Sequence, residues 1–129
     1  NFKKGGQIFL YKVNNPSQYG VAQIKNNKII KIIEKSKKSQ SKFAVTGVYF
    51  YDNKVIDFVK TLKPSKRNEI EITDLNNLYL KSNDCEVVYL ENDSVWFDSG
   101  TFDSLLEASI YIKRNINSHL MLTLIQKNN

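Results

Sequence analysis

The chain has 129 residues, of which 41% are hydrophobic and 12% aromatic, so it is long enough to bury a core within one domain. Its apolar runs are of strand length, which excludes a membrane-spanning helix, and its first residues lack the apolar stretch of a signal peptide. The net charge is +6, yet only two of the 19 basic residues are Arg, namely Arg67 and Arg114. Because the lysines are scattered and form no nucleic-acid-binding motif, we expect neither a nucleic acid nor a membrane as partner.

The single cysteine is Cys85, so no disulfide can form within the chain. A lone thiol favours a reducing compartment, and the sequence therefore predicts a cytoplasmic protein. Cys85 lies in a strand-like run, where we expect a buried structural thiol and not a nucleophile.

In chain order, the first predicted elements are strands. Residues 14–17 read as a turn, and Lys25–Lys28 reads as a hairpin turn between two strands that should pair antiparallel. The strand predicted at Phe43–Tyr51 is apolar on both faces, which is typical of a central position in a sheet. The predicted strands are Gln7–Val13, Tyr19–Ile24, Ile29–Ile33 and Phe43–Tyr51.

Two helices are predicted after these strands. The first covers Lys54–Leu62, with Val55, Ile56 and Val59 expected to face inward. The second covers Glu69–Leu80, because its apolar residues recur at helical spacing on one face.

A strand, a strand end and a helix are predicted in the last third of the chain. Cys85–Leu90 and Val95–Phe97 have strand composition, and Thr101 can cap a helix that runs to about Ile116. Asp98 would then lie at the carboxyl end of a strand, where a carboxylate suits a Mg²⁺ site. The alternative is that Asp98 only shapes the turn or caps the helix.

Together these elements predict one α/β domain, residues 1–129, with a mixed sheet and flanking helices. The sequence contains neither of the Gly-rich phosphate loops that bind nucleotides, the G-x-G-x-x-G form or the P-loop form. An α/β enzyme that acts on nucleotides normally carries such a loop after its first strand. That part is therefore expected to be absent from this chain.

Several ordered motifs resemble the second half of bacterial glucose-1-phosphate thymidylyltransferases, members of the sugar-1-phosphate nucleotidyltransferase family. Two shorter motifs, Tyr19–Val21 and Ile33–Lys35, have the order and spacing of that family. The resemblance fades after about Arg114. The three longer motifs are Ala44–Tyr51 (AVTGVYFY), Lys63–Asp74 (KPSKRNEIEITD) and Trp96–Thr101 (WFDSGT).

The resemblance implies the second half of a Rossmann-like nucleotidyltransferase fold and a particular reaction. A phosphate oxygen of glucose 1-phosphate would attack the α-phosphorus of dTTP, giving dTDP-glucose and pyrophosphate, with Mg²⁺ and cationic side chains balancing the charge. In this family the first half supplies the nucleotide loop, and the second half supplies the sugar-phosphate site and one metal-binding Asp. The resemblance further implies a homo-oligomeric full-length enzyme that supplies dTDP-rhamnose biosynthesis for polysaccharides.

Residue by residue, the resemblance implies Lys35 and Arg67 as groups that hold the sugar phosphate, and Asp98 as a metal ligand. These three are the implied catalytic residues. Glu34 would accept hydrogen bonds from sugar hydroxyls. The remaining implied substrate-binding residues approach or wall the sugar: Gly20, Val45, Thr46, Tyr49 and Trp96.

Each charged residue also has a purely structural alternative. Glu34 and Lys35 could form a surface ion pair, and Arg67 could pair with Glu69 or Glu71. Tyr49 could be a core aromatic. The sequence also departs from the family pattern at three positions, where Pro, Gly and Thr are usual: Ser36, Asn68 and Ser99.

Three functions therefore stay open at this point. The chain is part of a sugar-1-phosphate nucleotidyltransferase that needs its N-terminal half, in the same chain or as a partner. Alternatively, it is a non-catalytic module, left by truncation, that binds sugar phosphate or self-associates. The third and weakest possibility is a basic nucleic-acid binder.

Overall fold

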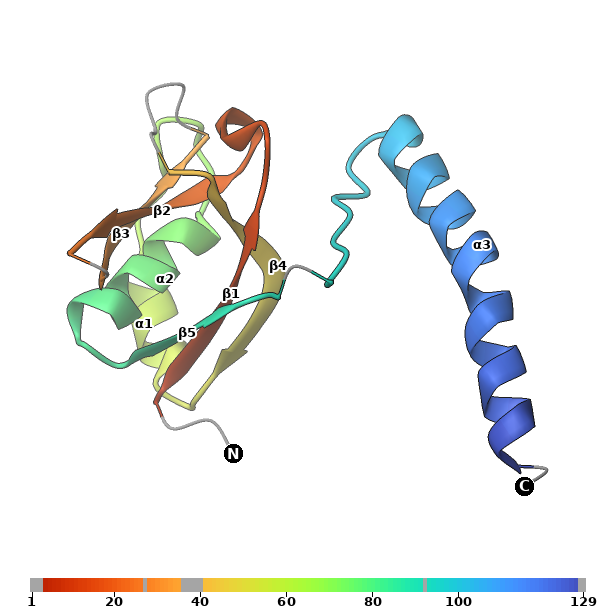
Figure 1. Cartoon of the computed structure of the whole chain (residues 1–129). Helices are drawn as coiled ribbons and strands as arrows, with labels where there is room; N and C mark the ends of the chain where they lie inside the picture. Colours follow the sequence, from red (N-terminus) through yellow and green to blue (C-terminus); the bar gives the residue numbers. More distant parts are fainter. Residues whose placement is uncertain (1–3, 27, 36–40, 92, 128–129) are drawn as a thin grey trace. The chain divides into compact units, whose positions relative to one another are not determined.

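The computed structural model describes residues 4–26, 28–35, 41–91 and 93–127, with side chains up to residue 115. The chain divides into two compact units, Asn1–Ser94 and Val95–Asn129, and each is described by itself (Figure 1). The first unit contains the sheet and two short helices, and the second contains one long helix.

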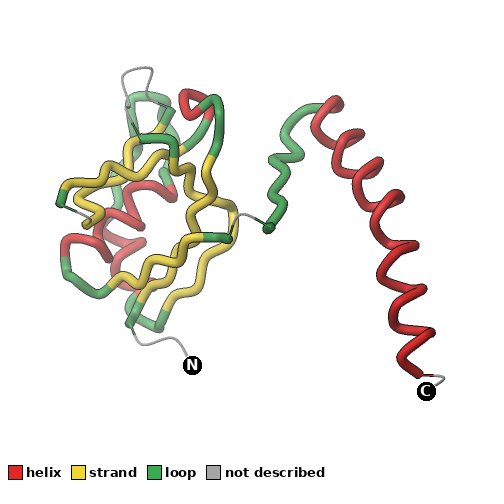
Figure 2. The backbone as a smooth tube through the Cα atoms, in the orientation of Figure 1, coloured by secondary structure: helices red, strands yellow, loops and turns green. Residues whose placement is uncertain are grey.

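The first unit is built on a five-stranded sheet with the order β3-β2-β4-β1-β5. Its strands are drawn in yellow in Figure 2. Neighbouring strands pair antiparallel, except that β1 and β5 pair parallel. The sheet is therefore mixed, as predicted, and the strand that was expected to be central lies in the middle. The strands are β1 (Gly6–Lys12), β2 (Gly20–Lys25), β3 (Lys28–Glu34), β4 (Phe43–Tyr51) and β5 (Cys85–Tyr89).

Two helices, α1 (Val55–Thr61) and α2 (Ile72–Lys81), accompany the sheet, and α2 packs against β3, β1 and β5. A single 3-10 turn, η1 (Pro16–Gln18), precedes β2. Tyr79 on α2 is completely buried, and its ring lies 5.2 Å from that of Tyr51. The fully or nearly fully buried apolar side chains form the core: Ile8, Leu10, Val21, Ala22, Ile32, Ala44, Leu75 and Tyr79.

A side-chain amide ties α2 to the edge strand β3. Asn77 Oδ1 accepts a hydrogen bond from the backbone N–H of Ile32 at 2.8 Å. Asn77 Nδ2 donates a second hydrogen bond to the carbonyl of Ile32 at 2.9 Å. Both backbone groups of Ile32 that point away from β2 are thus satisfied by one helical residue, which fixes the height of α2 along β3.

The register between β1 and β4 shifts near the middle of β4. Ile8 is opposite Tyr49 and Leu10 is opposite Val45, so the one residue between them on β1 faces three residues of β4. The additional residues form a bulge at 46–48, which re-aims the side chains of β4. A Cβ added at Gly47, within this bulge, would meet no atom within 4 Å.

Two predictions for the helices of the first unit are wrong in detail. Ile56 and Val59 are 59% and 47% exposed, because α1 turns Phe58 inward against the Tyr79 ring at 4.8 Å. Helix α2 begins at Ile72 and not at Glu69. Glu71 is extended, with φ −92° and ψ 129°, because the preceding loop closes on itself before the helix starts.

The second unit consists of an irregular segment and helix α3 (Phe102–Lys127). The strand predicted at Val95–Phe97 does not form, because no described strand pairs with this segment. Thr101 caps α3 as predicted: its Oγ1 accepts the backbone N–H of Ser104 at 3.1 Å. The helix extends well beyond the expected end at about Ile116. Of the described helices, none combines the length and apolar character that crossing a membrane requires.

Cys85 at the start of β5 is half-buried and free. Burial raises the pKa of its thiol to about 11, so the group is protonated at neutral pH. This environment agrees with the structural role that its position predicts.

Candidate functional site

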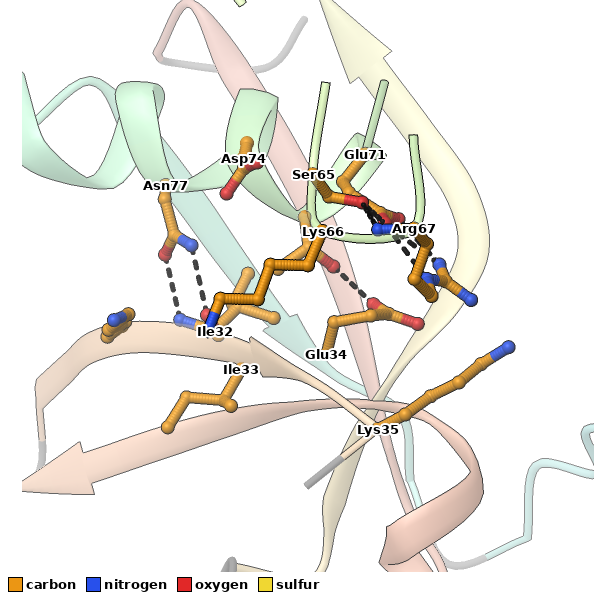
Figure 3. Close-up of a pocket in the computed structure, with 12 residues that line it drawn as sticks. Ile32, Ile33, Glu34, Lys35, Ser65, Lys66, Arg67, Glu71, Asp74 and Asn77 are labelled. Atoms are coloured by element: carbon orange, nitrogen blue, oxygen red, sulfur yellow. Dashed lines mark hydrogen bonds and ion pairs between the residues drawn. The ribbon is translucent and has the colours of Figure 1, made fainter. Parts of the chain in front are cut away.

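An open pocket of about 420 Å³ lies where β3 ends beside the loop at 65–71 and the first turns of α2 (Figure 3). It brings together three of the residues implied by the family resemblance, Glu34, Lys35 and Arg67. Four cationic and three anionic side chains line it, so a singly charged acidic ligand would meet groups of both signs. They are Lys31, Lys35, Lys66, Arg67, Glu34, Glu71 and Asp74.

Glu34 is the last residue of β3, and one of its carboxylate oxygens is held in place. Thr73 on α2 donates a hydrogen bond from Oγ1 to Glu34 Oε2 at 2.6 Å. Gly20 lies opposite Glu34 in the sheet, and a Cβ at Gly20 would approach Glu34 Oε2 to 3.0 Å and Thr73 Oγ1 to 3.2 Å. A side chain at position 20 would therefore crowd the Thr73–Glu34 hydrogen bond. That bond uses Oε2, and Oε1 is left to accept hydrogen bonds from a ligand.

Arg67 is engaged by two carboxylates of its own loop. Its Nε and Nη2 lie 3.1 and 2.9 Å from Glu71 Oε1, and Nη2 lies 2.8 Å from Glu71 Oε2. Nη2 also lies 3.2 Å from Glu69 Oε2. Both structural alternatives for Arg67 are thus realised. Hydrogen bonds from Arg67, and then from Ser65, lower the pKa of Glu71, and Glu71 in turn raises the pKa of Arg67.

Lys35 follows β3 in a left-handed conformation with φ 43°. Its backbone N–H donates to the carbonyl of Tyr19 at 3.0 Å, which holds this unusual geometry. Among the described residues Lys35 forms no ion pair with Glu34, whose carboxylate is bound by Thr73 instead. Asn68 is also left-handed, with φ 60°, a conformation that Asn adopts more readily than most residues with a side chain.

The three implied residues of β4 do not line this pocket. Val45 lies opposite Leu10, and Thr46 is 1% exposed with an Oγ1 that has no hydrogen-bond partner among the described residues. Tyr49 stacks on Tyr51 with ring centres 6.1 Å apart. Burial, and secondly the charge of Glu34, raise the pKa of Tyr49.

Trp96 and Asp98 belong to the second unit. Asp98 is exposed just before a turn at Ser99 and Gly100, and a Cβ at Gly100 would lie 3.4 Å from its Oδ1. In the described part of the chain, no cluster of three or more His, Cys, Asp or Glu side chains could hold a metal ion. A single exposed carboxylate nevertheless fits Mg²⁺, which commonly takes one or two carboxylates and completes its shell with water and phosphate oxygens.

Thr73 and Ser65 are among the pocket residues to which sequence reasoning assigned no role. Thr73 lies two residues after Glu71, and this spacing puts both side chains on the turn that faces Glu34 and Arg67. Ser65 Oγ donates to Glu71 Oε1 at 2.7 Å. The motif at 63–74 contains all of these residues, but their hydrogen bonds depend on the tertiary packing of α2 on β3.

Comparison with known proteins places the chain in a family. The family model described as nucleotidyl transferase matches residues 1–115. The glucose-1-phosphate thymidylyltransferase of Mycolicibacterium smegmatis is 47% identical over 110 residues, covering 84% of this chain and 38% of that protein. The enzyme of the same name from Xanthomonas campestris pv. campestris is 46% identical over 112 residues, covering 86% of this chain and 38% of that protein. The chain thus spans less than half the length of these relatives.

Solved structures agree. A crystal structure from Bacillus anthracis, assigned as a glucose-1-phosphate thymidylyltransferase and in complex with sucrose, superposes with a TM-score of 0.72 at 48% identity. The superposition covers 84% of this chain and 44% of the Bacillus anthracis chain. A UDP-glucose pyrophosphorylase complexed with UDP-glucose gives the same TM-score at 24% identity and shows the same fold. With its α/β fold, mixed sheet and matched residues 1–115, this chain belongs to the nucleotidyl transferase family.

Proposed function

We propose that this chain provides the sugar-phosphate half of a glucose-1-phosphate thymidylyltransferase, which converts glucose 1-phosphate and dTTP to dTDP-glucose and pyrophosphate. The observation that carries the proposal is the convergence of Glu34, Lys35 and Arg67 on one pocket of the first unit. The relatives named for this reaction, at 46–47% identity, support the choice of substrates.

Each pocket residue has a role that follows from its chemistry. Glu34 accepts hydrogen bonds from sugar hydroxyls through Oε1, because Thr73 occupies Oε2. Lys35 binds the phosphate through the point charge of its ammonium group, and Arg67 binds it through hydrogen bonds from its planar guanidinium. By placing the phosphate, these two cations aim its oxygen at the α-phosphorus of the nucleotide and offset the negative charge of the two reactants.

The sheet residues Gly20, Val45, Thr46 and Tyr49, together with Trp96 of the second unit, are proposed as the further sugar-binding residues. Asp98 is the proposed ligand of Mg²⁺, which would neutralise phosphate charge when bound. The active enzyme would draw its nucleotide loop from an N-terminal half, in the same chain or in a partner, and would assemble as a homo-oligomer. The proposed setting is the cytoplasm, where dTDP-glucose would feed dTDP-rhamnose biosynthesis for polysaccharides.

The test is calorimetric titration of the chain with glucose 1-phosphate, with and without Mg²⁺. We expect saturable binding that Arg67→Ala weakens by about tenfold or more, because the charge-assisted hydrogen bonds from the guanidinium to the phosphate are lost. Lys60→Ala is the control, since Lys60 lies on α1 outside the pocket and pairs with Asp57. A folded chain that does not bind glucose 1-phosphate, or an Arg67 variant that binds like the wild type, would contradict the proposal.

A turnover assay, run after the titration, separates the enzyme half from a non-catalytic module. The pocket lies within one unit of the chain, which favours binding without any further segment. Adding dTTP and Mg²⁺ to the chain loaded with glucose 1-phosphate and following pyrophosphate release then distinguishes the two. Turnover that appears only when an N-terminal half from a relative is supplied would support the enzyme half, and binding with no turnover under either condition would support the module.

A further inference from the structure

The guanidinium of Arg67 is held from one side only. Three of its hydrogen bonds, from Nε and Nη2, end on the carboxylate of Glu71, and Nη2 also contacts Glu69. Nη1 donates to no group in the described part of the chain. Arg67 and Lys35 extend to the same side of the pocket (Figure 3). The Glu71 contact therefore fixes the plane of the guanidinium and leaves one nitrogen for a ligand.

Glu71 is itself anchored, whereas Glu69 is not. The Glu71 side chain is 13% exposed and receives a hydrogen bond from Ser65 Oγ at 2.7 Å. The same hydroxyl accepts the backbone N–H of Arg67 at 3.1 Å, and the backbone N–H of Ser65 donates to the Glu69 carbonyl at 2.8 Å. The Glu69 side chain is 62% exposed and makes one contact with Arg67. Of the two carboxylates, only Glu71 can hold Arg67 in a defined orientation.

We propose that Glu71, anchored by Ser65, is a positioning residue for phosphate binding that presents the Nη1 edge of Arg67 to the ligand. This inference rests on the proposed function, because it concerns how the same pocket takes a sugar phosphate. Glu71 does not touch the ligand in this scheme. It prevents a long, 45% exposed Arg side chain from spreading over many rotamers, so less entropy is lost when the phosphate binds.

Charge alone predicts the opposite effect. A carboxylate beside a phosphate site repels the anion, so its removal should strengthen binding. If Glu71 positions Arg67, removing its charge should weaken binding even though the pocket becomes more positive. Glu69 pairs with the same guanidinium but lacks an anchor, so it reports the charge effect without the positioning effect.

The experiment therefore compares Glu71→Gln with Glu69→Gln, titrating each with glucose 1-phosphate and with inorganic phosphate. We expect Glu71→Gln to raise the Kd for both ligands on the order of tenfold, because the cation is no longer preorganised. Glu69→Gln should leave the Kd unchanged or lower it about twofold. A Glu71→Gln chain that binds as tightly as the wild type, or more tightly, overturns the inference.

A spectroscopic measurement separates positioning from a general loss of structure. The chain has only two arginines, so ¹⁵N spectra of the Arg Nε–H groups contain two assignable signals. The Arg67 Nε–H should be protected from exchange in the wild type and in Glu69→Gln, and should lose that protection in Glu71→Gln while the melting temperature stays within a few degrees. Equal protection in the wild type and Glu71→Gln would contradict the positioning role.

Ser65→Ala keeps the proposal testable if Glu71→Gln does not fold. This variant retains both carboxylates and removes only the anchor of Glu71. We expect a weakening in the same direction but smaller, and unchanged affinity would overturn the inference. Absence of binding by the folded wild type contradicts the proposed function itself, whereas binding that Arg67→Ala weakens and Glu71→Gln does not contradicts the positioning role alone.

Discussion

Thr73 donates its hydroxyl to Glu34 Oε2 across 2.6 Å, joining the first turn of α2 to the last residue of β3. Thr73 is 6% exposed, so this hydrogen bond is shielded from water. A carboxylate fixed at one oxygen presents the other in a single direction, which is what recognition of a particular sugar hydroxyl requires.

Replacing Thr73 tests this arrangement. Thr73→Val keeps the shape but removes the donor, and should lower the free energy of unfolding by about 1–2 kcal/mol because a hydrogen bond to a charged group is lost. The same variant should weaken the binding of glucose 1-phosphate more than the binding of inorganic phosphate, since Glu34 is proposed to face the sugar. Thr73→Ser retains the hydroxyl and should behave like the wild type. Equal weakening of both ligands would show that Glu34 does not read the sugar.

The left-handed backbone at Lys35 should lower the stability of the fold, while its ammonium group serves phosphate binding. Its φ of 43° costs an L-residue with a side chain about 1 kcal/mol, which glycine avoids. Lys35→Gly and Lys35→Ala should both lose phosphate affinity, because both lose the ammonium group. Only Lys35→Gly should relieve the strain of the left-handed backbone. Its free energy of unfolding, measured by chemical denaturation, should therefore be about 1 kcal/mol higher than that of Lys35→Ala. Equal stability of the two variants would mean that the left-handed conformation is not strained.

The buried hydroxyl of Thr46 should likewise lower the stability of the fold. Its Oγ1 is buried and finds no hydrogen-bond partner among the described residues, a situation that costs about 1–3 kcal/mol. Thr46→Val should therefore raise the free energy of unfolding by about 1 kcal/mol. If the hydroxyl is kept for a sugar, the same variant should bind glucose 1-phosphate more weakly, while Thr46→Ser should bind normally. A destabilised Thr46→Val would indicate that the hydroxyl is already satisfied.

Asp84 should make stability depend on pH. The backbone N–H of Gly5 at 2.9 Å, and then Lys54 at 2.9 Å, lower the pKa of Asp84 below its ordinary value of 3.8. Because the folded pKa is the lower one, the stabilisation is complete above about pH 5 and is lost as the pH falls through the folded pKa. Asp84→Asn should flatten the fall of unfolding free energy between about pH 5 and pH 2.

The control for Asp84 is Asp57→Asn, which removes an 82% exposed carboxylate from α1. Urea unfolding of the wild type and both variants across this pH range gives the slopes. If Asp84→Asn and Asp57→Asn change the slope equally, the interactions of Asp84 with Gly5 and Lys54 do not contribute.

Most of the sheet could be predicted because its strands carry their own signals. The hairpin at Lys25–Lys28 and the apolar run Phe43–Tyr51 depend on local composition, and both lie where they were expected. Val95–Phe97 has equally good strand composition but forms no strand. Composition indicates a preference for extended backbone, whereas a strand also needs a neighbour, which short-range pattern cannot supply.

The site could be predicted only in outline. The motifs placed Glu34, Lys35 and Arg67 in separate segments, and the fold brings them to one pocket. Pattern could not decide between Glu69 and Glu71 as the partner of Arg67, because both lie within reach along the chain, and the guanidinium in fact contacts both. The bond from Thr73 to Glu34 spans 39 positions, so it follows from packing and not from spacing.

The amide of Asn77 has a further consequence for the molecule in solution. Of the described strands, β3 forms one edge of the sheet, and an open edge can pair with a strand of another chain and so begin aggregation. By occupying both outward backbone groups of Ile32, Asn77 withdraws the hydrogen-bonding positions that an incoming strand would need in the middle of β3. Asn77, which fixes α2 beside the pocket, thereby also hinders β3 from pairing with a strand of another chain.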